Sequence, residues 1–97
     1  METNGQKETE KISVSHSNEG TINKNSVTIE TERARLTLYF SYETIVCFNG
    51  CGDEATIKNY WSTTTGKFLN ELQPNKNLRL DENEFKKRLR IALNSLF

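Results

Sequence analysis

The amino-acid sequence predicts an α+β fold: a three-stranded antiparallel meander covered on one face by two C-terminal helices, with a disordered N-terminal tail. Three patterns predict it. Apolar and polar residues alternate beyond Val27, an Asn-Gly pair favours a hairpin, and the C-terminal segment has an apolar stripe of helical period. A chain of 97 residues has room for one domain.

Residues 1–26 are predicted to be a disordered polar tail, and residues 27–97 the single folded domain. The tail consists mainly of Glu, Lys, Asn, Ser, Thr and Gly, with only isolated apolar residues at Ile12, Val14 and Ile22. Burying so few apolar side chains cannot offset the entropy lost on ordering the backbone.

The first predicted strand covers 33–40, where Leu36 and Leu38 share one face with Ala34 and Phe40. A second strand follows at 44–48 and a third at 54–60. Asn49-Gly50 favours a type I′ turn between these two, because both central residues of that turn need positive φ. Gly52 makes a longer loop or a bulge an equal alternative.

Two helices follow the strands. The first is expected to begin in the hydroxyl run 62–65 and to end before Pro74. The second begins at Asp81 as N-cap, with Glu84 at the third helical position and Leu80 placed to pack on Phe85. Its apolar stripe has helical spacing and consists of Phe85, Leu89, Ala92, Leu93 and Leu96.

Composition limits where the protein acts. Thirteen basic and 13 acidic residues cancel, so no global field draws the chain to nucleic acid or anionic lipid. We see no signal peptide and no apolar run of membrane-span length, so the expected location is cytoplasmic, in the host cell if the protein is viral. Cys47 and Cys51 are too few for a disulfide-stapled fold, and their redox state stays open.

No catalytic or metal-binding pattern stands out. The single histidine, His16, lies in the predicted tail, far from Cys47 and Cys51, so neither a nucleophile–base pair nor a four-ligand metal site is expected. The prediction is therefore a protein that is not an enzyme and has no cofactor. An enzyme with a composite site in a dimer is the remote alternative.

The segment 60–67 is similar in composition to a phosphate-binding loop, but Trp61 and Phe68 occupy positions where a Walker A motif needs Gly and Ser or Thr. A simpler anion site at this helix start could still hold a nucleic-acid phosphate. The candidate nucleic-acid or anion-binding residues are Lys58, Trp61, Ser62, Thr63, Thr64, Lys67, Arg33 and Arg35. Self-association as a homodimer would use Ile91 and Phe97, which fall outside the apolar stripe or at its margin.

The blocks 38–46 and 61–70 resemble a small uncharacterised family of phage, plasmid and archaeal-virus proteins. Its members have a Tyr-Phe-Ser-Tyr strand and a Trp-Ser-x-Thr-Thr-Gly-Lys-x-Leu-Asn block, often with His where this chain has Phe68. The resemblance implies a mobile-element setting and carries no assigned activity.

The function expected from these observations is that of a non-catalytic binding module of a virus or mobile element. Its partner would be a host protein, including a component of a host defence complex that it inhibits, or nucleic acid. A protein partner would use the exposed sheet face and the tail. A nucleic acid would use the helix start between Ser62 and Lys67. No membrane partner is expected.

Overall fold

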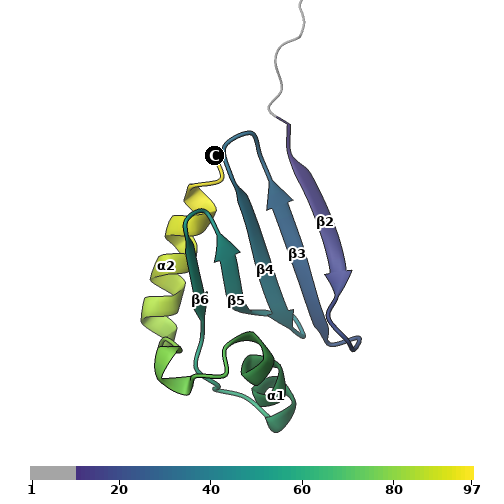
Figure 1. Ribbon diagram of the computed structural model, residues 1–97, viewed down its shortest axis with the longest axis vertical. Helices are drawn as coiled ribbons and strands as arrows, with labels where there is room; N and C mark the ends of the chain where they lie inside the picture. Colours follow the sequence, from purple (N-terminus) through teal and green to yellow (C-terminus); the bar gives the residue numbers. More distant parts are fainter. Residues whose placement is uncertain (1–10) are drawn as a thin grey trace, which may run out of the picture.

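The computed structural model describes residues 11–97, which form one antiparallel sheet, two α-helices and a short 3-10 helix (Figure 1). Consecutive strands are neighbours, so the sheet is a meander of five strands in the order β2-β3-β4-β5-β6. The predicted α+β class, antiparallel sheet and two C-terminal helices are confirmed, whereas the prediction of three strands is wrong. The elements are β2 (Ser13–Asn18), β3 (Lys24–Glu30), β4 (Arg35–Ser41), β5 (Thr44–Gly50), β6 (Asp53–Thr56), α1 (Thr63–Leu72), η1 (Lys76–Leu78) and α2 (Glu82–Asn94).

The two additional strands lie where the tail was predicted. β2 falls wholly within residues 1–26, and the predicted domain boundary before Val27 falls inside β3. Val27 pairs with Leu38, and Ile29 pairs with Leu36, so β3 extends the apolar face of β4. β2 has little to bury and is ordered by its backbone pairing with β3, which composition does not reveal. The part of the tail prediction that concerns residues 1–10 lies outside the described residues.

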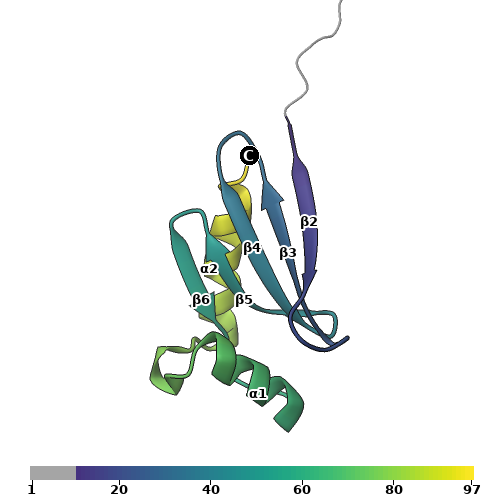
Figure 2. The same cartoon turned by 45° about the vertical axis from the view of Figure 1, so that its right-hand side comes forward.

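The core lies on one face of the sheet, beneath α2. Phe48 of β5 and Phe85 of α2 are both buried, and their ring centroids are 5.8 Å apart. Figure 2 shows α2 behind the sheet, against β5 and β6. The buried cluster continues from this face to Phe68 and Leu69 of α1; its members are Leu36, Leu38, Val46, Phe48, Ile57, Phe68, Leu69, Phe85, Ala92 and Leu96.

The two helices do not share that face. α1 crosses the lower end of the sheet (Figure 2). There the Thr65 Oγ1 atom is 2.8 Å from the Ser41 Oγ atom, and the Lys24 ammonium lies 5.4 Å from the Phe68 ring centroid. Lys24 and Ser41 are partners in the sheet and, by alternation, lie on the face opposite Leu38. The prediction that both helices cover one face is therefore wrong for α1.

The hairpin turns also differ from the predicted ones. Gly50 pairs with Asp53, so the turn between β5 and β6 is Cys51-Gly52, with φ of 54° and 82°, and not Asn49-Gly50. Gly50 is needed for another reason: a Cβ atom there would lie 2.2 Å from the Arg35 carbonyl oxygen. In the turn between β4 and β5, Tyr42 takes the positive φ of 57°.

The start and the inner face of α2 are as predicted. The Asp81 carboxylate accepts a hydrogen bond of 2.9 Å from the Glu84 backbone N–H, as an N-cap does. Phe85, Ala92 and Leu96 are buried, while the remaining two stripe residues, Leu89 and Leu93, are half-buried. Among the described residues, no helix is both long enough and apolar enough to cross a membrane.

Candidate functional site

The predicted nucleic-acid residues lie at opposite ends of the sheet. Arg35 begins β4 and lies 3.5 Å from the Glu30 carboxylate, while the Arg33 guanidinium donates to the Phe97 carbonyl. The other candidates, Lys58 to Lys67, lie near the far end of β4, because its last residue, Ser41, contacts α1. A strand of this length spans about 20 Å. The structure therefore does not bring the two groups into one surface.

The helix start itself is less organised for anion binding than the sequence indicates. Ser62 is the N-cap of α1, but its side chain makes no capping hydrogen bond. Thr63, Thr64 and Lys67 are exposed. Trp61 is 44% exposed. It packs edge-to-face against Tyr60 and lines a recess of about 230 Å³ with residues of β4, β5 and α1.

A different recess collects the basic side chains. It has a volume of about 370 Å³ and lies between α1, η1 and the segment that follows β6. From the predicted set only Lys58 lines it. Lys76 and Arg79 were missed because they are remote from Lys58 in the sequence. A contact absent from the pattern, the parallel bridge between Ile57 and Leu80, brings these segments together. The lining residues are Lys58, Asn59, Gly66, Asn70, Lys76 and Arg79.

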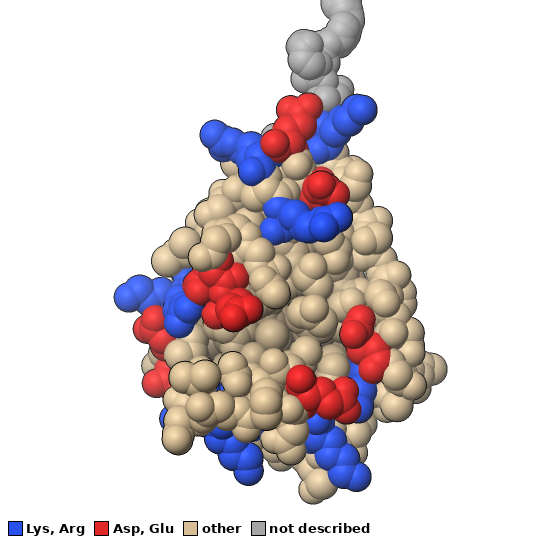
Figure 3. All heavy atoms as spheres, in the orientation of Figure 1, with Lys and Arg blue, Asp and Glu red and all other residues tan. Residues whose placement is uncertain are grey.

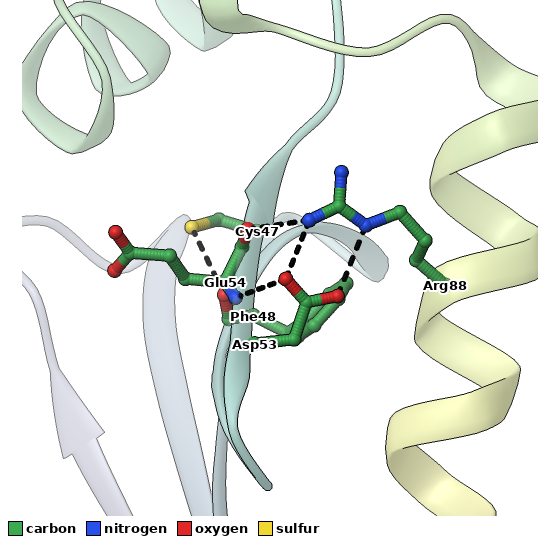
Figure 4. A network of polar contacts seen from close by, with 5 residues as sticks. All are labelled: Cys47, Phe48, Asp53, Glu54 and Arg88. Atoms are coloured by element: carbon green, nitrogen blue, oxygen red, sulfur yellow. Dashed lines mark hydrogen bonds and ion pairs between the residues drawn. The ribbon is translucent and has the colours of Figure 1, made fainter.

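An ion pair connects β6, at the edge of the sheet, to α2 (Figure 4). The Arg88 guanidinium of α2 donates to both carboxylate oxygens of Asp53, with Nε 3.0 Å from Oδ2, and to the Glu54 carbonyl at 3.4 Å. The hydrogen bonds from Arg88 lower the pKa of the Asp53 carboxyl, although its partial desolvation acts in the opposite direction. This edge is therefore tied to α2.

We expect Arg88→Ala to lower the free energy of unfolding at pH 7 by about 1 kcal/mol, since the pair is bidentate but a third exposed. A carboxyl with a lowered folded-state pKa contributes stability above its unfolded pKa and loses that contribution as pH falls through the folded value. The difference from wild type should therefore shrink below about pH 4. Urea unfolding of Arg88→Ala and wild type at pH 7 and pH 3 measures this difference in free energy, with Arg90→Ala, at an exposed position, as the control. A difference that does not change with pH would contradict the role of Asp53.

Both thiols are free and protonated at neutral pH. Cys47 is buried and points away from α2 (Figure 4), and the Thr56 hydroxyl lies 3.2 Å from its sulfur. Burial raises the pKa of the Cys47 thiol despite this hydrogen bond, and partial burial raises that of Cys51. A raised pKa lowers the thiolate fraction, so neither sulfur is prepared as a nucleophile.

Histidine and acidic side chains form no evident metal centre in the described part of the chain. The His16 ring nitrogen is 2.8 Å from the Asn25 amide oxygen. Within residues 11–97, no group of three or more His, Cys, Asp and Glu side chains is placed to hold a metal ion. The two predicted self-association residues, Ile91 and Phe97, are 58% and 55% exposed.

The sheet face beyond α1 is rich in hydroxyl groups, which are exposed on β2 and buried or half-buried on β3 and β4. Alternation and register place side chains of β2, β3 and β4 together on the face opposite the core, where Thr28 and Thr37 lie 2.9 Å apart. In Figure 3 the middle of this side of the molecule carries no charged side chain, and Lys, Arg, Asp and Glu surround it. The hydroxyl-bearing residues are Ser13, Ser15, Ser17, Ser26, Thr28, Thr37 and Tyr39.

β2 leaves one edge of the sheet unpaired within the described part of the chain. It pairs with β3 on one side only, and all six of its residues are exposed. Its sequence, Ser-Val-Ser-His-Ser-Asn, contains no Lys, Arg, Asp, Glu or Pro. Edge strands of monomeric proteins usually carry such residues, which prevent pairing with another chain. β2 lacks this protection, in contrast to β6.

Comparisons with other proteins give one match. No curated protein and no solved structure matches the chain significantly. A model of a family of unknown function, DUF8033, matches residues 9–88, which include all five strands, α1, η1 and the first half of α2. The chain therefore belongs to the DUF8033 family of unknown function.

Proposed function

We propose that this protein is a non-catalytic binding module that holds an extended segment of another protein against β2, as a sixth strand of its sheet. The observation that carries the proposal is the unprotected edge of β2. Backbone N–H and C=O groups on such an edge form the same hydrogen bonds with an incoming strand as with a neighbouring strand of the sheet.

The faces beside β2 would supply the specificity. On one face Val14 is 66% exposed and is the register partner of Ile29. On the other face Ser13, Ser15 and Ser17 continue the row of hydroxyl groups from β3 and β4. Alternate side chains of an added strand would therefore meet one apolar and one hydroxyl-lined surface.

The setting of this binding follows from the resemblance of the blocks 38–46 and 61–70 to phage, plasmid and archaeal-virus proteins. We propose a protein of the host cytoplasm as the partner, with inhibition of a defence complex as one form of the activity. Nucleic acid is the weaker alternative, because the net charge is zero and the predicted basic residues do not share a surface.

Ser15→Lys is the direct test of the β2 edge. A lysine on an edge strand disfavours the approach of a further strand, so we expect partner binding to weaken at least roughly fivefold. Asn83→Lys is the matched control, since it adds the same charge on the exposed surface of α2. Both variants should melt at the temperature of the wild type.

The contact can be located by photo-crosslinking in host cells from position 15 and, for comparison, from position 83. We expect one protein adduct from position 15 that is absent from position 83, and protection of β2 amides from hydrogen exchange in the purified complex. Adducts of equal yield from both positions would contradict the proposal. An adduct with the mass of two copies of this chain would mean that β2 binds a second copy of the protein, and the proposal of a host partner would be wrong.

A further inference from the structure

The recess between α1 and η1 is built from three segments that one short contact holds together. The Leu80 N–H donates to the Thr56 carbonyl at 2.9 Å, and the Lys58 N–H donates to the Leu80 carbonyl at 2.8 Å. These two hydrogen bonds fix the chain after β6 beside the chain after η1. Lys58 from the first segment and Lys76 and Arg79 from the second therefore line the same cavity as α1.

Arg79 is a buried charge without a carboxylate. It is only 6% exposed, and no Asp or Glu of the described chain forms an ion pair with it. Its hydrogen bonds go to neutral oxygens: Nε and Nη2 donate to the Gln73 carbonyl, and Nη2 also donates to the Asn70 amide oxygen at 2.7 Å. Burying a cation is costly unless a counter-charge is close.

A structural role accounts for part of this arrangement. Gln73 is the C-cap of α1, so two of the Arg79 hydrogen bonds satisfy a carbonyl at the negative end of the helix. The remaining nitrogen, Nη1, forms no hydrogen bond among the described residues. Since no buried side-chain nitrogen or oxygen atom there lacks a partner, Nη1 is accessible to solvent, and Arg79 is one of the residues that line the recess. Capping of α1 does not account for the presence of Lys58 and Lys76 in the same recess.

Gly66 of α1 lines the same recess. A Cβ atom at Gly66 would lie 2.9 Å from the Asn59 amide nitrogen, so a larger residue there would require the Asn59 side chain to shift. Asn59 is held there by two hydrogen bonds, from the Trp61 N–H and to the Ser62 carbonyl. The glycine, which lowers the helix propensity of α1, therefore has a packing reason at this site.

We propose that this recess binds the phosphate group of a small phosphorylated molecule. Its lining has three cationic groups and no acidic one, which suits a dianion. Because Asn70 accepts from Arg79 through its oxygen, its amide N–H groups remain free to donate. The volume of about 370 Å³ leaves room for an organic group beside the phosphate. The site lies apart from the β2 edge and does not depend on it.

Isothermal titration of the full chain at low salt tests the site, with a nucleoside monophosphate, a sugar phosphate, inorganic phosphate and an unphosphorylated nucleoside as probes. We expect both phosphate monoesters to bind and the nucleoside not to bind. Lys76→Ala and Lys58→Ala should each weaken monoester binding about tenfold, because each removes a charged donor. Both lysines are exposed, so the variants should keep the wild-type melting temperature.

Lys67→Ala is the matched control. It removes the same charge from α1, but its side chain does not line the recess, so binding should stay within about twofold of wild type. Absence of monoester binding at low salt would overturn the proposal, as would an equal loss in Lys67→Ala. Equally tight binding of a DNA oligonucleotide without a terminal phosphate would also overturn it, since the ligand would then be a phosphodiester. None of these results bears on β2, which hydrogen exchange tests separately.

Discussion

Phe48→Ala is expected to destabilise the protein by about 3–5 kcal/mol. Phe48 is fully buried at the centre of the face that α2 covers, and its ring packs against that of Phe85. Alanine would leave a cavity between the sheet and the helix that neither can close without losing its other contacts. A domain of this size has a free energy of unfolding of roughly 5–10 kcal/mol, so this loss would remove a large part of its stability.

Urea unfolding followed by circular dichroism measures the effect of Phe48→Ala, and Phe97→Ala is the matched control. Phe97 is 55% exposed, so its loss should change the free energy of unfolding by less than about 1 kcal/mol. A similar loss in both variants would mean that the pairing of Phe48 with Phe85 is not the centre of the core.

Deletion of residues 1–26 is expected to abolish cooperative unfolding. A chain that begins at Val27 lacks β2 and the first half of β3, so β4 loses the register partners of Tyr39, Phe40 and Ser41. It also loses Lys24, which contacts the Phe68 ring and forms an ion pair with Glu71 at 3.1 Å. The lower end of the sheet would then contact α1 through fewer residues, although the contact between Ser41 and Thr65 would remain. Thermal melting followed by circular dichroism checks this.

A chain that begins at Gly20 separates the contribution of β3 from that of β2. Every residue of β2 is exposed, so its removal should leave a cooperative transition with a modest loss of stability. The same truncation should abolish partner binding at the sheet edge, because β3 would replace β2 as the edge strand. If the Val27 chain melted as cooperatively as the Gly20 chain, the folding role assigned to β3 would be wrong.

Sequence reasoning succeeded where a residue's role depends on its near neighbours. Asp81 caps α2, and the helical spacing from Phe85 to Leu96 identifies the face that packs on the sheet. The alternation around Leu36 and Leu38 likewise identifies the buried face of β4. It failed for β2, whose polar residues look like a disordered segment because its order comes from backbone hydrogen bonds to β3.

The sequence by itself determined the α+β class, the start and inner face of α2, and the apolar alternation of β4, because each depends on residues within a few positions of one another. Only the tertiary structure decided that β2 forms an open edge, that α1 lies across the end of the sheet, and that Lys58, Lys76 and Arg79 line one recess. These features depend on pairing between distant segments, such as Ile57 with Leu80, and a local pattern carries no information about that pairing.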